Sequence, residues 1–375
     1  MIPFNKPYLA GKETFYIEDA VSSGKISGNG KYTKMCQDYF EKKYAFKKCL
    51  LTTSCTDALE MCAILANIEK GDEIIIPSYT FVSTALAFVR QGAKIIFADS
   101  SADNPNIDVA KIESLITSKT KAIVPVHYAG IACDMEAIMN LATKYNLLVI
   151  EDAAQAIDSF FIFKDGTRKA LGSIGHLAAF SFHETKNIIA GEGGMLAIND
   201  DKFIHRAEII WEKGTNRAEF FRGEINKYGW VDTGSSFLPS EIISAFLWAQ
   251  LEQLDFIQNK RKELWNMYNK LLKPHENLGF KIVDVPSFAT NNAHMFFIVF
   301  DDLEKRSSCI ERLKNNNIMA VFHYLSLHKS DYYKDKYTGE ELTWSDYYTD
   351  RLLRLPMYFE LTESDIMKIV SIIIQ

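Results

Sequence analysis

Long apolar runs and paired cysteines are both missing from this 375-residue sequence. No apolar stretch approaches the ~20 residues that a membrane-spanning helix needs. The opening segment, MIPFNKPYLAGKE, lacks the basic start and apolar core of a secretory signal peptide. The six cysteines stand singly, with no C-x-x-C pair and no zinc-ligand spacing. These absences predict reduced thiols, a cytoplasmic location and no membrane partner.

Concentrated positive charge is also absent. Lys and Arg total 42 against 48 for Asp and Glu, and the formal net charge is −6. Because nucleic-acid and anionic-membrane binders carry clustered basic side chains, this distribution argues against both classes of partner. Hydrophobic residues make up 47% and charged residues 24% of the chain, which is typical of a globular protein. We therefore expect a small-molecule partner.

The motifs of nucleotide hydrolases and metalloenzymes are missing as well. The segment GNGKYT, residues 28–33, fails the spacing of a phosphate-binding P-loop and has Tyr32 where that motif needs Ser or Thr. The eight histidines include no H-E-x-x-H pair, and the carboxylates near them form no ligand cluster. The sequence therefore predicts neither a nucleoside triphosphatase nor a metal centre.

Short β-branched runs alternate with longer helical patterns in the first half of the chain. This rhythm predicts a parallel sheet covered by helices on both faces. In such sheets the chemistry lies at the carboxyl ends of the strands, and several of these runs end in polar residues. The runs occupy residues 72–78, 93–99, 121–127 and 146–153.

The pattern changes near residue 241, where a helical pattern begins that extends to residue 272 and is long enough to bridge two domains. We expect a large α/β domain over residues 1–250 and a small α+β C-terminal domain over 251–375. The elements expected in the small domain are strands at 293–300 and 316–325 and helices at 307–315 and 363–373.

The segment SFHETKNIIAGEGG, residues 181–194, contains the first candidate catalytic residue, Lys186. A single lysine is most often a solvated surface residue. Here the apolar run AAFSF leads into the segment and Gly191, Gly193 and Gly194 end it, so the lysine stands between parts suited to a buried site. An amine partly removed from water loses proton affinity and becomes nucleophilic, as Schiff-base formation with an aldehyde requires.

Asp152 follows the apolar run LLVIE and has three interpretations. Such an acid holds magnesium in nucleotide hydrolases, but the P-loop that accompanies it is missing. It also serves as an ordinary cap for a helix that begins at Ala153. Beside a Schiff-base lysine, it has a sharper use, because an anion there keeps a pyridine nitrogen protonated and makes the ring an electron sink.

The segment TTSCTDALEMCAIL, residues 52–65, places hydroxyl side chains and an acid before an apolar helix. That pattern is typical of a plain N-cap, and it is equally typical of a phosphate site at a helix N-terminus. A phosphate site, an acid for a ring nitrogen and a lysine for an aldehyde are the three contacts of pyridoxal 5'-phosphate. Together the three segments predict this cofactor.

These segments resemble the DegT/DnrJ/EryC1/StrS family of aminotransferases, which act on nucleotide-linked keto-sugars with pyridoxal 5'-phosphate. The resemblance covers nearly the whole chain. It implies an aspartate-aminotransferase-like fold, a homodimer and L-glutamate as the amino donor. It is carried by SGKISGNGKYTKMCQDYFEKKYA, TSCTDALEM, PSYTFVSTALAFVRQGAKIIFAD, PVHYAG, EDAAQA, FSFHETKN with GEGG, HYLSLH and RLLRLPMY.

The resemblance implies a role for each matching residue. Lys186 forms the Schiff base and later transfers protons, Asp152 pairs with the ring nitrogen, and Gln155 lies near the ring hydroxyl. Many members have a G-x-N-[YF]-R segment whose asparagine reaches the phosphate of the neighbouring subunit, and this chain has Ser236 there, within GSSFL. The other implied cofactor contacts are Thr56, Asp57 and Ser181 at the phosphate and Phe81, which stacks on the ring or is a core residue.

Within the family, the chain most resembles members that aminate C4 of dTDP-4-dehydro-6-deoxy-D-glucose, giving dTDP-4-amino-4,6-dideoxy-D-galactose for enterobacterial surface polysaccharide. The likeness is concentrated in VHYAG (126–130), EKGTNR (212–217) and VFHYLSLH (321–328). The alternatives are the gluco epimer, a 3-aminotransferase, a sugar dehydratase with histidine in place of the lysine, and a non-catalytic binding protein. The candidate substrate contacts, each of which is otherwise a packed polar residue, are His127, Tyr128, His183, His323 and Tyr324.

Overall fold

A seven-stranded sheet forms the centre of the computed structural model, which describes residues 1–375. Only β9 runs antiparallel to the other six strands. The predicted strand at 121–127 is too long, because β4 ends before Pro125, which has no N–H for the ladder. The strands in spatial order are β1 (Lys48–Thr52), β9 (Gly194–Ile198), β8 (Leu177–Ser181), β5 (Leu148–Asp152), β4 (Thr120–Ile123), β2 (Glu73–Pro77) and β3 (Lys94–Ala98).

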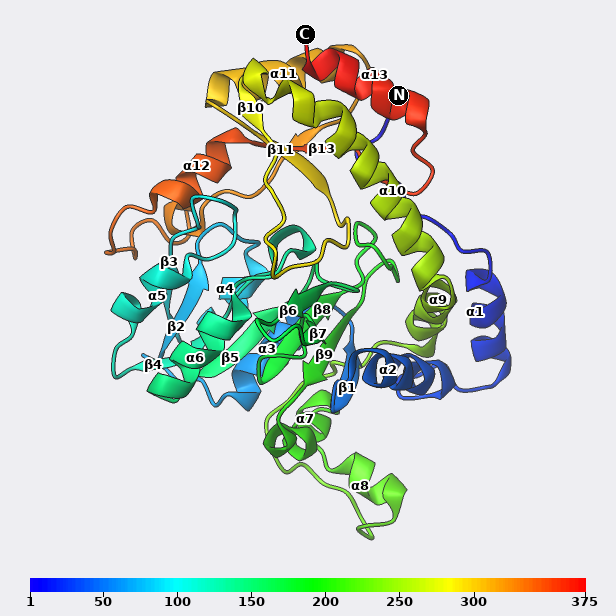
Figure 1. Cartoon of the computed structure of the whole chain (residues 1–375). Helices are drawn as coiled ribbons and strands as arrows, with labels where there is room; N and C mark the ends of the chain where they lie inside the picture. The colour runs from blue at the N-terminus through cyan, green and yellow to red at the C-terminus, as the bar shows by residue number, and fades with distance from the viewer.

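Helices cover both faces of this sheet (Figure 1), which confirms the predicted α/β class. Along β2, Ile74 and Ile76 join a cluster of 30 buried residues on one face, whereas Ile75 joins a cluster of 46 on the other. One face packs against α3 (Cys55–Leu65), α4 (Ser83–Val89) and α7 (Ile204–Trp211), and the other against α2 (Lys31–Tyr44), α5 (Val109–Leu115), α6 (Met135–Tyr145) and α9 (Glu241–Glu252).

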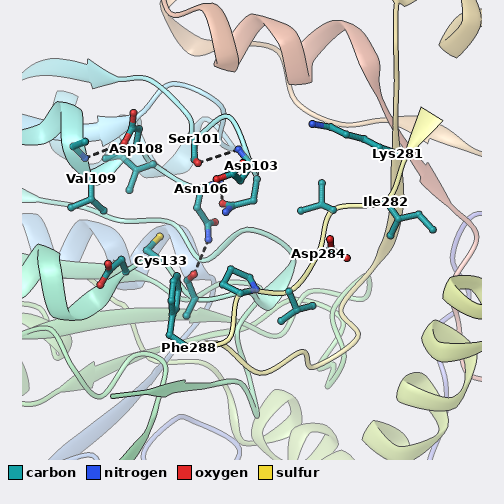
Figure 2. Close-up of a pocket in the computed structure, with 18 residues that line it drawn as sticks. Ser101, Asp103, Asn106, Asp108, Val109, Cys133, Lys281, Ile282, Asp284 and Phe288 are labelled. Atoms are coloured by element: carbon teal, nitrogen blue, oxygen red, sulfur yellow. Dashed lines mark hydrogen bonds between the residues drawn. The ribbon is translucent and has the colours of Figure 1, made fainter. Parts of the chain in front are cut away.

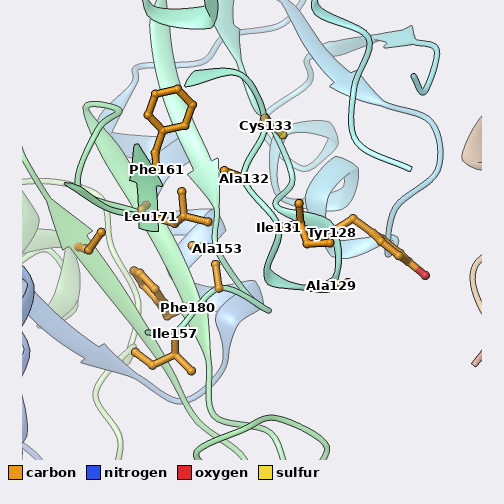
Figure 3. Packing of buried hydrophobic residues seen from close by; sticks show 14 of the residues in the cluster. Tyr128, Ala129, Ile131, Ala132, Cys133, Ala153, Ile157, Phe161, Leu171 and Phe180 are labelled. Atoms are coloured by element: carbon orange, nitrogen blue, oxygen red, sulfur yellow. The ribbon is translucent and has the colours of Figure 1, made fainter. Parts of the chain in front are cut away.

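Figure 3 shows part of the larger cluster, around the residues that follow β5. Ala153 and Ile157 come directly after that strand, and Phe180 lies on its neighbour β8. All three side chains are nearly inaccessible to solvent. Because a packed core resists rearrangement, this cluster holds the carboxyl end of β5 in a fixed position.

The predicted bridging helix over 241–272 is two helices rather than one. It is interrupted at Gln253, whose backbone (φ −110°, ψ 12°) departs from the helical region. The first part, α9, packs on α1 (Glu13–Ser22) and α2 beside the central sheet, whereas α10 (Leu254–Leu272) continues toward the second sheet (Figure 1). The break lets the two helices follow different surfaces.

The second sheet has four antiparallel strands, and 24 buried residues pack between it and its helices. The predicted strand at 316–325 is mostly wrong, because only β12 pairs and Tyr324 has a left-handed backbone (φ 49°). The division of domains near residue 250 stays a prediction. The elements are β10 (Phe280–Lys281), β11 (Phe296–Phe300), β13 (Leu352–Leu355), β12 (Val321–Phe322), α11 (Leu303–Asn315), α12 (Thr343–Arg351) and α13 (Glu363–Ile373).

No helix of the chain combines the length and the apolar character needed to cross a membrane.

Short elements complete the chain. The α8 segment projects away from the body below α7 (Figure 1). The remaining elements are β6 (Phe160–Ile162), β7 (Arg168–Ala170), α8 (Arg217–Arg222) and the 3₁₀ helices η1 (Tyr128–Gly130), η2 (Asp201–Phe203), η3 (Lys273–Leu278) and η4 (Leu327–Lys329).

Candidate active site

A cavity of about 620 Å³ lies at the carboxyl ends of β5 and β8, where segments of the second sheet also reach it. This volume is within the range of cofactor and small-ligand sites. The cavity brings together residues that lie up to 300 positions apart along the chain, from Ser54 to Arg354 (354 − 54 = 300). The predicted site residues that line it are Thr56, Phe81, Asp152, Gln155, Ser181, His183, Lys186, His323 and Tyr324.

Lys186 presents its amine to this cavity. The lysine follows β8 in a turn closed by its own N–H, which donates to the His183 carbonyl at 2.8 Å. Its Nζ has no hydrogen-bond or ion-pair partner in the protein and is open to the cavity. Burial lowers the pKa of the Lys186 amine, although the Cys55 thiol and Asp152 partly oppose this shift. The site therefore favours a neutral, nucleophilic amine.

Asp152 is a buried carboxylate without a cationic partner. Its side chain lies at the end of β5 and is part of a residue only 5% exposed. Oδ2 accepts a hydrogen bond from the Thr84 hydroxyl at 2.7 Å, and Oδ1 accepts one from the Ala154 N–H at 3.2 Å. Burial raises the pKa of Asp152, which these two hydrogen bonds partly offset. A bound cation would stabilise the ionised form further.

The N-terminus of α3 lies at the cavity wall. Ser54 caps the helix by accepting the Asp57 N–H, while the N–H groups of Cys55 and Thr56 bind no protein acceptor. The hydroxyls of Thr56 and Ser83 lie 2.7 Å apart beside them. A Cβ on Gly194 would collide with the backbone of Ser54 and Cys55, so only glycine lets β9 approach this turn. Free N–H groups and hydroxyls at a helix N-terminus suit a phosphate.

Aromatic rings and an amide also line the cavity. Gln155 accepts the Ala129 N–H through Oε1 and donates through Nε2 to the Tyr324 hydroxyl at 2.9 Å, so the direction of its amide is fixed. The rings of His323 and Tyr324 stack with centroids 3.5 Å apart. Phe81 is 56% exposed and its ring lies 6.1 Å from that of Tyr324. An exposed aromatic ring inside a cavity is available to pack on a flat ligand.

His183 lies at the open side of the cavity, close to the lysine in the chain. Its Nδ1 is 2.9 Å from the Thr185 hydroxyl, and its Nε2 is 3.7 Å from a carboxylate oxygen of Glu192. All three of these residues line the cavity. The sequence placed His183 beside Lys186, and the structure shows that it is a rim residue held by its neighbours.

Four of the predicted site residues lie outside the cavity wall. His127 is fully buried, with Nε2 2.9 Å from Glu151 and Nδ1 accepting the Cys133 N–H. Tyr128 is buried behind His323, with its hydroxyl 2.6 Å from Nδ1 of that ring. The other two are Asp57, whose carboxylate accepts the Thr53 hydroxyl, and Ser236, which lines a separate cleft.

Two basic residues of the cavity were missed by the sequence analysis. Arg354 reaches it from β13, and its Nε is buried without a hydrogen-bond partner. Burial lowers the pKa of this guanidinium, and three nearby tyrosines oppose the shift. His294 precedes β11 and also lines the cavity. An arginine within the apolar strand LLRL was a signal, but only the fold brings it to Lys186, 168 residues away (354 − 186 = 168).

A second cavity of about 590 Å³ lacks these features. Figure 2 shows its wall, where Asn106 points toward the backbone at residues 131–132 and donates to both carbonyls. Its one cysteine, Cys133, donates to the Val126 carbonyl. No group of three or more His, Cys, Asp or Glu side chains in the structure is placed to hold a metal ion. The cavity beside Lys186 is therefore the candidate active site.

Comparisons with known proteins agree with this geometry. The chain is 30% identical over 383 residues to the spore coat polysaccharide biosynthesis protein SpsC of Bacillus subtilis, covering 99% of this chain and 95% of SpsC. The sugar aminotransferase Spr1654 of Streptococcus pneumoniae, described as putative, in its PMP form, superposes with a TM-score of 0.90 at 23% identity, covering 100% and 98% of the two chains. PseC of Helicobacter pylori, an aminotransferase involved in pseudoaminic acid biosynthesis, gives 0.88 at 24% identity, covering 99% and 97%.

The family profile of the DegT/DnrJ/EryC1/StrS aminotransferases matches residues 7–374. The fold is thus that of the aminotransferases, as the resemblance implied. Aminotransferases of this family are PLP-dependent, and Spr1654 is known in PLP and PMP forms, so the cofactor is pyridoxal 5'-phosphate. The chain belongs to the DegT/DnrJ/EryC1/StrS aminotransferase family and is a PLP-dependent transaminase.

Proposed function

We propose that this transaminase moves an amino group from L-glutamate to C4 of dTDP-4-dehydro-6-deoxy-D-glucose and gives dTDP-4-amino-4,6-dideoxy-D-galactose. The observation that carries the proposal is a single cavity that combines an unpaired lysine amine, an unpaired buried carboxylate and a free helix N-terminus. A dehydratase of this fold replaces the lysine with histidine, so Lys186 argues against that alternative.

These residues fit the cofactor in charge and in shape. Asp152 is the anion for a protonated ring nitrogen, because it is buried and lacks any other cation. The α3 N-terminus, with Thr56 and Ser181, would hold the phosphate, and Phe81 would pack on the ring. Bound PLP supplies an electron sink for the carbon that loses its proton.

Lys186 is proposed to carry the proton. Its lowered pKa leaves a share of the amine neutral, so Nζ can take the proton from the α-carbon of the amino donor. With the cofactor bound, the same Nζ would hold that proton and return it, and it would do so again in the opposite direction when the keto-sugar receives the amine. The turn closed at the His183 carbonyl holds the lysine on the cavity wall.

Arg354 is proposed to hold the carboxylate of the amino donor. It is an arginine on the cavity wall with a buried and unpaired Nε, and a guanidinium binds a carboxylate through two parallel hydrogen bonds. The ionisable groups that act on its pKa are Tyr79, Tyr128 and Tyr324, and no carboxylate forms an ion pair with it. The donor class, an amino acid, follows from this pairing.

The substrate assignment depends on segments near the cavity. His323 and Tyr324 of the segment VFHYLSLH line the wall, and Tyr128 of VHYAG supports His323 from behind. The polysaccharide role in the name of SpsC and the sugar aminotransferase description of Spr1654 support a sugar acceptor. The gluco epimer is the alternative product, because the face of C4 that receives the proton depends on how the pocket orients the ring.

We further propose a homodimer whose sites are shared between subunits. The cleft that contains Ser236 has a volume of about 360 Å³ and lies in the segment implied to reach the neighbouring subunit. Beside it, α8 exposes Phe221 (68%) and the segment after α8 exposes Trp230 (83%), which are apolar surfaces that a second copy would cover. The cleft contains one acid, Glu212, and four cations that suit a diphosphate: Lys25, Lys34, Lys213 and Arg217.

The six unpaired cysteines fit the cytoplasmic location we propose.

The first prediction concerns the position of the cofactor. Borohydride reduction of the purified, yellow enzyme should attach the cofactor to Lys186, because its amine is the one that faces the cavity unpaired. Peptide mass spectrometry locates the adduct. Lys186→Ala should lose both the absorbance band and turnover, while Lys164→Ala, a change of an exposed lysine, should keep both. An adduct on any other lysine contradicts the assignment.

The second prediction concerns the charge of Asp152. Asp152→Asn keeps the shape of the side chain but removes the anion, so it should slow turnover by roughly a thousandfold or more. The measurement is kcat with saturating cofactor, and absorbance shows whether the cofactor is still bound. No helix begins at Ala153, so near wild-type turnover with cofactor bound would leave Asp152 as a residue that only holds the turn after β5, through the Ala154 N–H.

The third prediction is the product. The purified enzyme, L-glutamate and a panel of nucleotide keto-sugars should give an amine at C4 of dTDP-4-dehydro-6-deoxy-D-glucose. Proton NMR of the product should show a small H3–H4 coupling, which means an axial nitrogen. A large diaxial coupling identifies the gluco product and refutes the proposed epimer, and an amine at C3 refutes the regiochemistry.

The fourth prediction tests the shared site by complementation. Lys213→Glu with Arg217→Glu should reduce turnover of the nucleotide sugar, and Lys186→Ala should abolish it. After the two variants are unfolded and refolded together, random pairing should restore roughly a quarter of the native sites. Lys164→Glu mixed with Lys186→Ala should show only its own activity. Failure of the first mixture to exceed the sum of its parts would show that each subunit works alone.

A further inference from the structure

Asn187, directly after Lys186, has an amide whose direction is fixed by its partners. Its Nδ2 donates to the backbone carbonyl of Asn292 at 2.9 Å and to Oε1 of Gln258 at 2.8 Å. A carbonyl oxygen only accepts hydrogen bonds, so the NH₂ group of Asn187 must face it. The amide oxygen of Asn187 therefore faces the remaining neighbour, the ring of His294.

This arrangement determines the tautomer of His294. The Asn187 oxygen lies 2.8 Å from Nδ1 of the ring and can only accept, so Nδ1 must carry a hydrogen. In a neutral imidazole the other nitrogen, Nε2, is then a bare acceptor. Burial lowers the pKa of His294 well below its ordinary value, so the ring stays neutral.

The bare Nε2 of His294 faces the cavity. It has no hydrogen-bond partner in the protein. Three side-chain atoms in the structure are both inaccessible and without a hydrogen-bond partner: Tyr44 Oη, Arg312 Nε and Arg354 Nε. Because His294 Nε2 also has no partner but is not one of these atoms, it is accessible. His294 and Arg354 line the same cavity, one offering a lone pair and the other a cation.

These two groups select opposite parts of a ligand. A guanidinium attracts a carboxylate, whereas a bare imidazole nitrogen repels carboxylate oxygens and accepts a hydrogen from an ammonium or amine. An α-amino acid has both groups on one carbon. The lowered pKa argues against proton uptake by His294 and leaves it a hydrogen-bond acceptor.

We propose that Nε2 of His294 binds the α-amino group of the amino donor, and that Asn187 acts as a positioning residue that fixes the His294 tautomer. This inference rests on the proposed transamination and adds a recognition residue to it. Gln258 of α10 connects the arrangement to the helix between the two sheets, since it accepts the Asn187 amide. The tautomer is thereby coupled to the placement of the second sheet.

The tautomer is tested in the holoenzyme by NMR of ¹⁵N-labelled histidine. The eight ring pairs should include one with hydrogen on Nδ1 and a bare Nε2 that does not titrate between pH 6 and 8, and His294→Gln should remove it. His127 and His176 are internal comparators of the opposite tautomer, because Nδ1 of each accepts a backbone N–H. A hydrogen on Nε2 of His294, or titration in this range, overturns the proposal.

The binding role is tested by comparing the two half-reactions. His294→Met removes the acceptor and should raise the KM for glutamate about 10- to 100-fold, the effect of losing a hydrogen bond to a charged group. The KM for the keto-sugar should stay within about twofold, because the acceptor contacts the donor. His294→Gln, which keeps an acceptor oxygen, should recover part of the loss. His275→Gln, at a histidine without hydrogen bonds on η3, is the matched control.

The outcomes distinguish a failure of the proposed transamination from a failure of the role proposed for His294. Wild-type enzyme that converts no amino donor overturns the proposed function and the donor assignment with it, whatever the tautomer. Wild-type enzyme that converts glutamate, with His294→Met equal to it, overturns this inference alone. A change in the keto-sugar KM without one in the glutamate KM assigns His294 to the sugar and also overturns it.

Discussion

Burial of the central strands on both faces is the constraint on which the rest of the structure depends. Alternate residues of β2 enter different hydrophobic clusters, so a polar side chain within such a strand would have no water to contact. Polar groups therefore appear where the strands end. Asp152 ends β5 and Lys186 follows β8, and these two strands are parallel neighbours. Their adjacency brings an acid and an amine to one edge of the sheet.

The second sheet supplies part of the cavity wall beside the central sheet. The central sheet supplies the contacts proposed for the cofactor, whereas Arg354 and His294 come from β13 and from the segment before β11. Asn187 is hydrogen-bonded to Gln258 of α10, the helix that continues toward that sheet. The residues proposed to bind the donor therefore belong to a different layer from those proposed to hold the cofactor.

Elements and site residues that depend on local sequence pattern could be predicted from the sequence. Those that depend on tertiary packing could not. Lys186, Asp152 and Thr56 were found because each stands beside a strand or helix end with a readable signal. His127 and Tyr128 could not be separated from cavity residues, because whether a polar side chain faces a cavity or a core partner such as Glu151 is decided by tertiary contacts. The predicted long helix failed at Gln253 for the same reason, since its pattern is continuous while its two halves pack on different surfaces. Arg354 needed the fold, and the roles of all these residues stay predictions.

Burial acts in the same way on the ionisable groups of the cavity. Burial raises the pKa of Asp152 and lowers the pKa values of Lys186, Arg354, His294 and His323, so it disfavours the charged form of each. Groups held in this way gain most from ligands of complementary charge, because pairing removes the cost of desolvation. A cofactor with a phosphate and a ring cation, and a donor with a carboxylate and an amine, offer such partners. Specificity for these ligands then comes from the same burial that makes the lysine nucleophilic, and a more hydrated cavity would weaken both together.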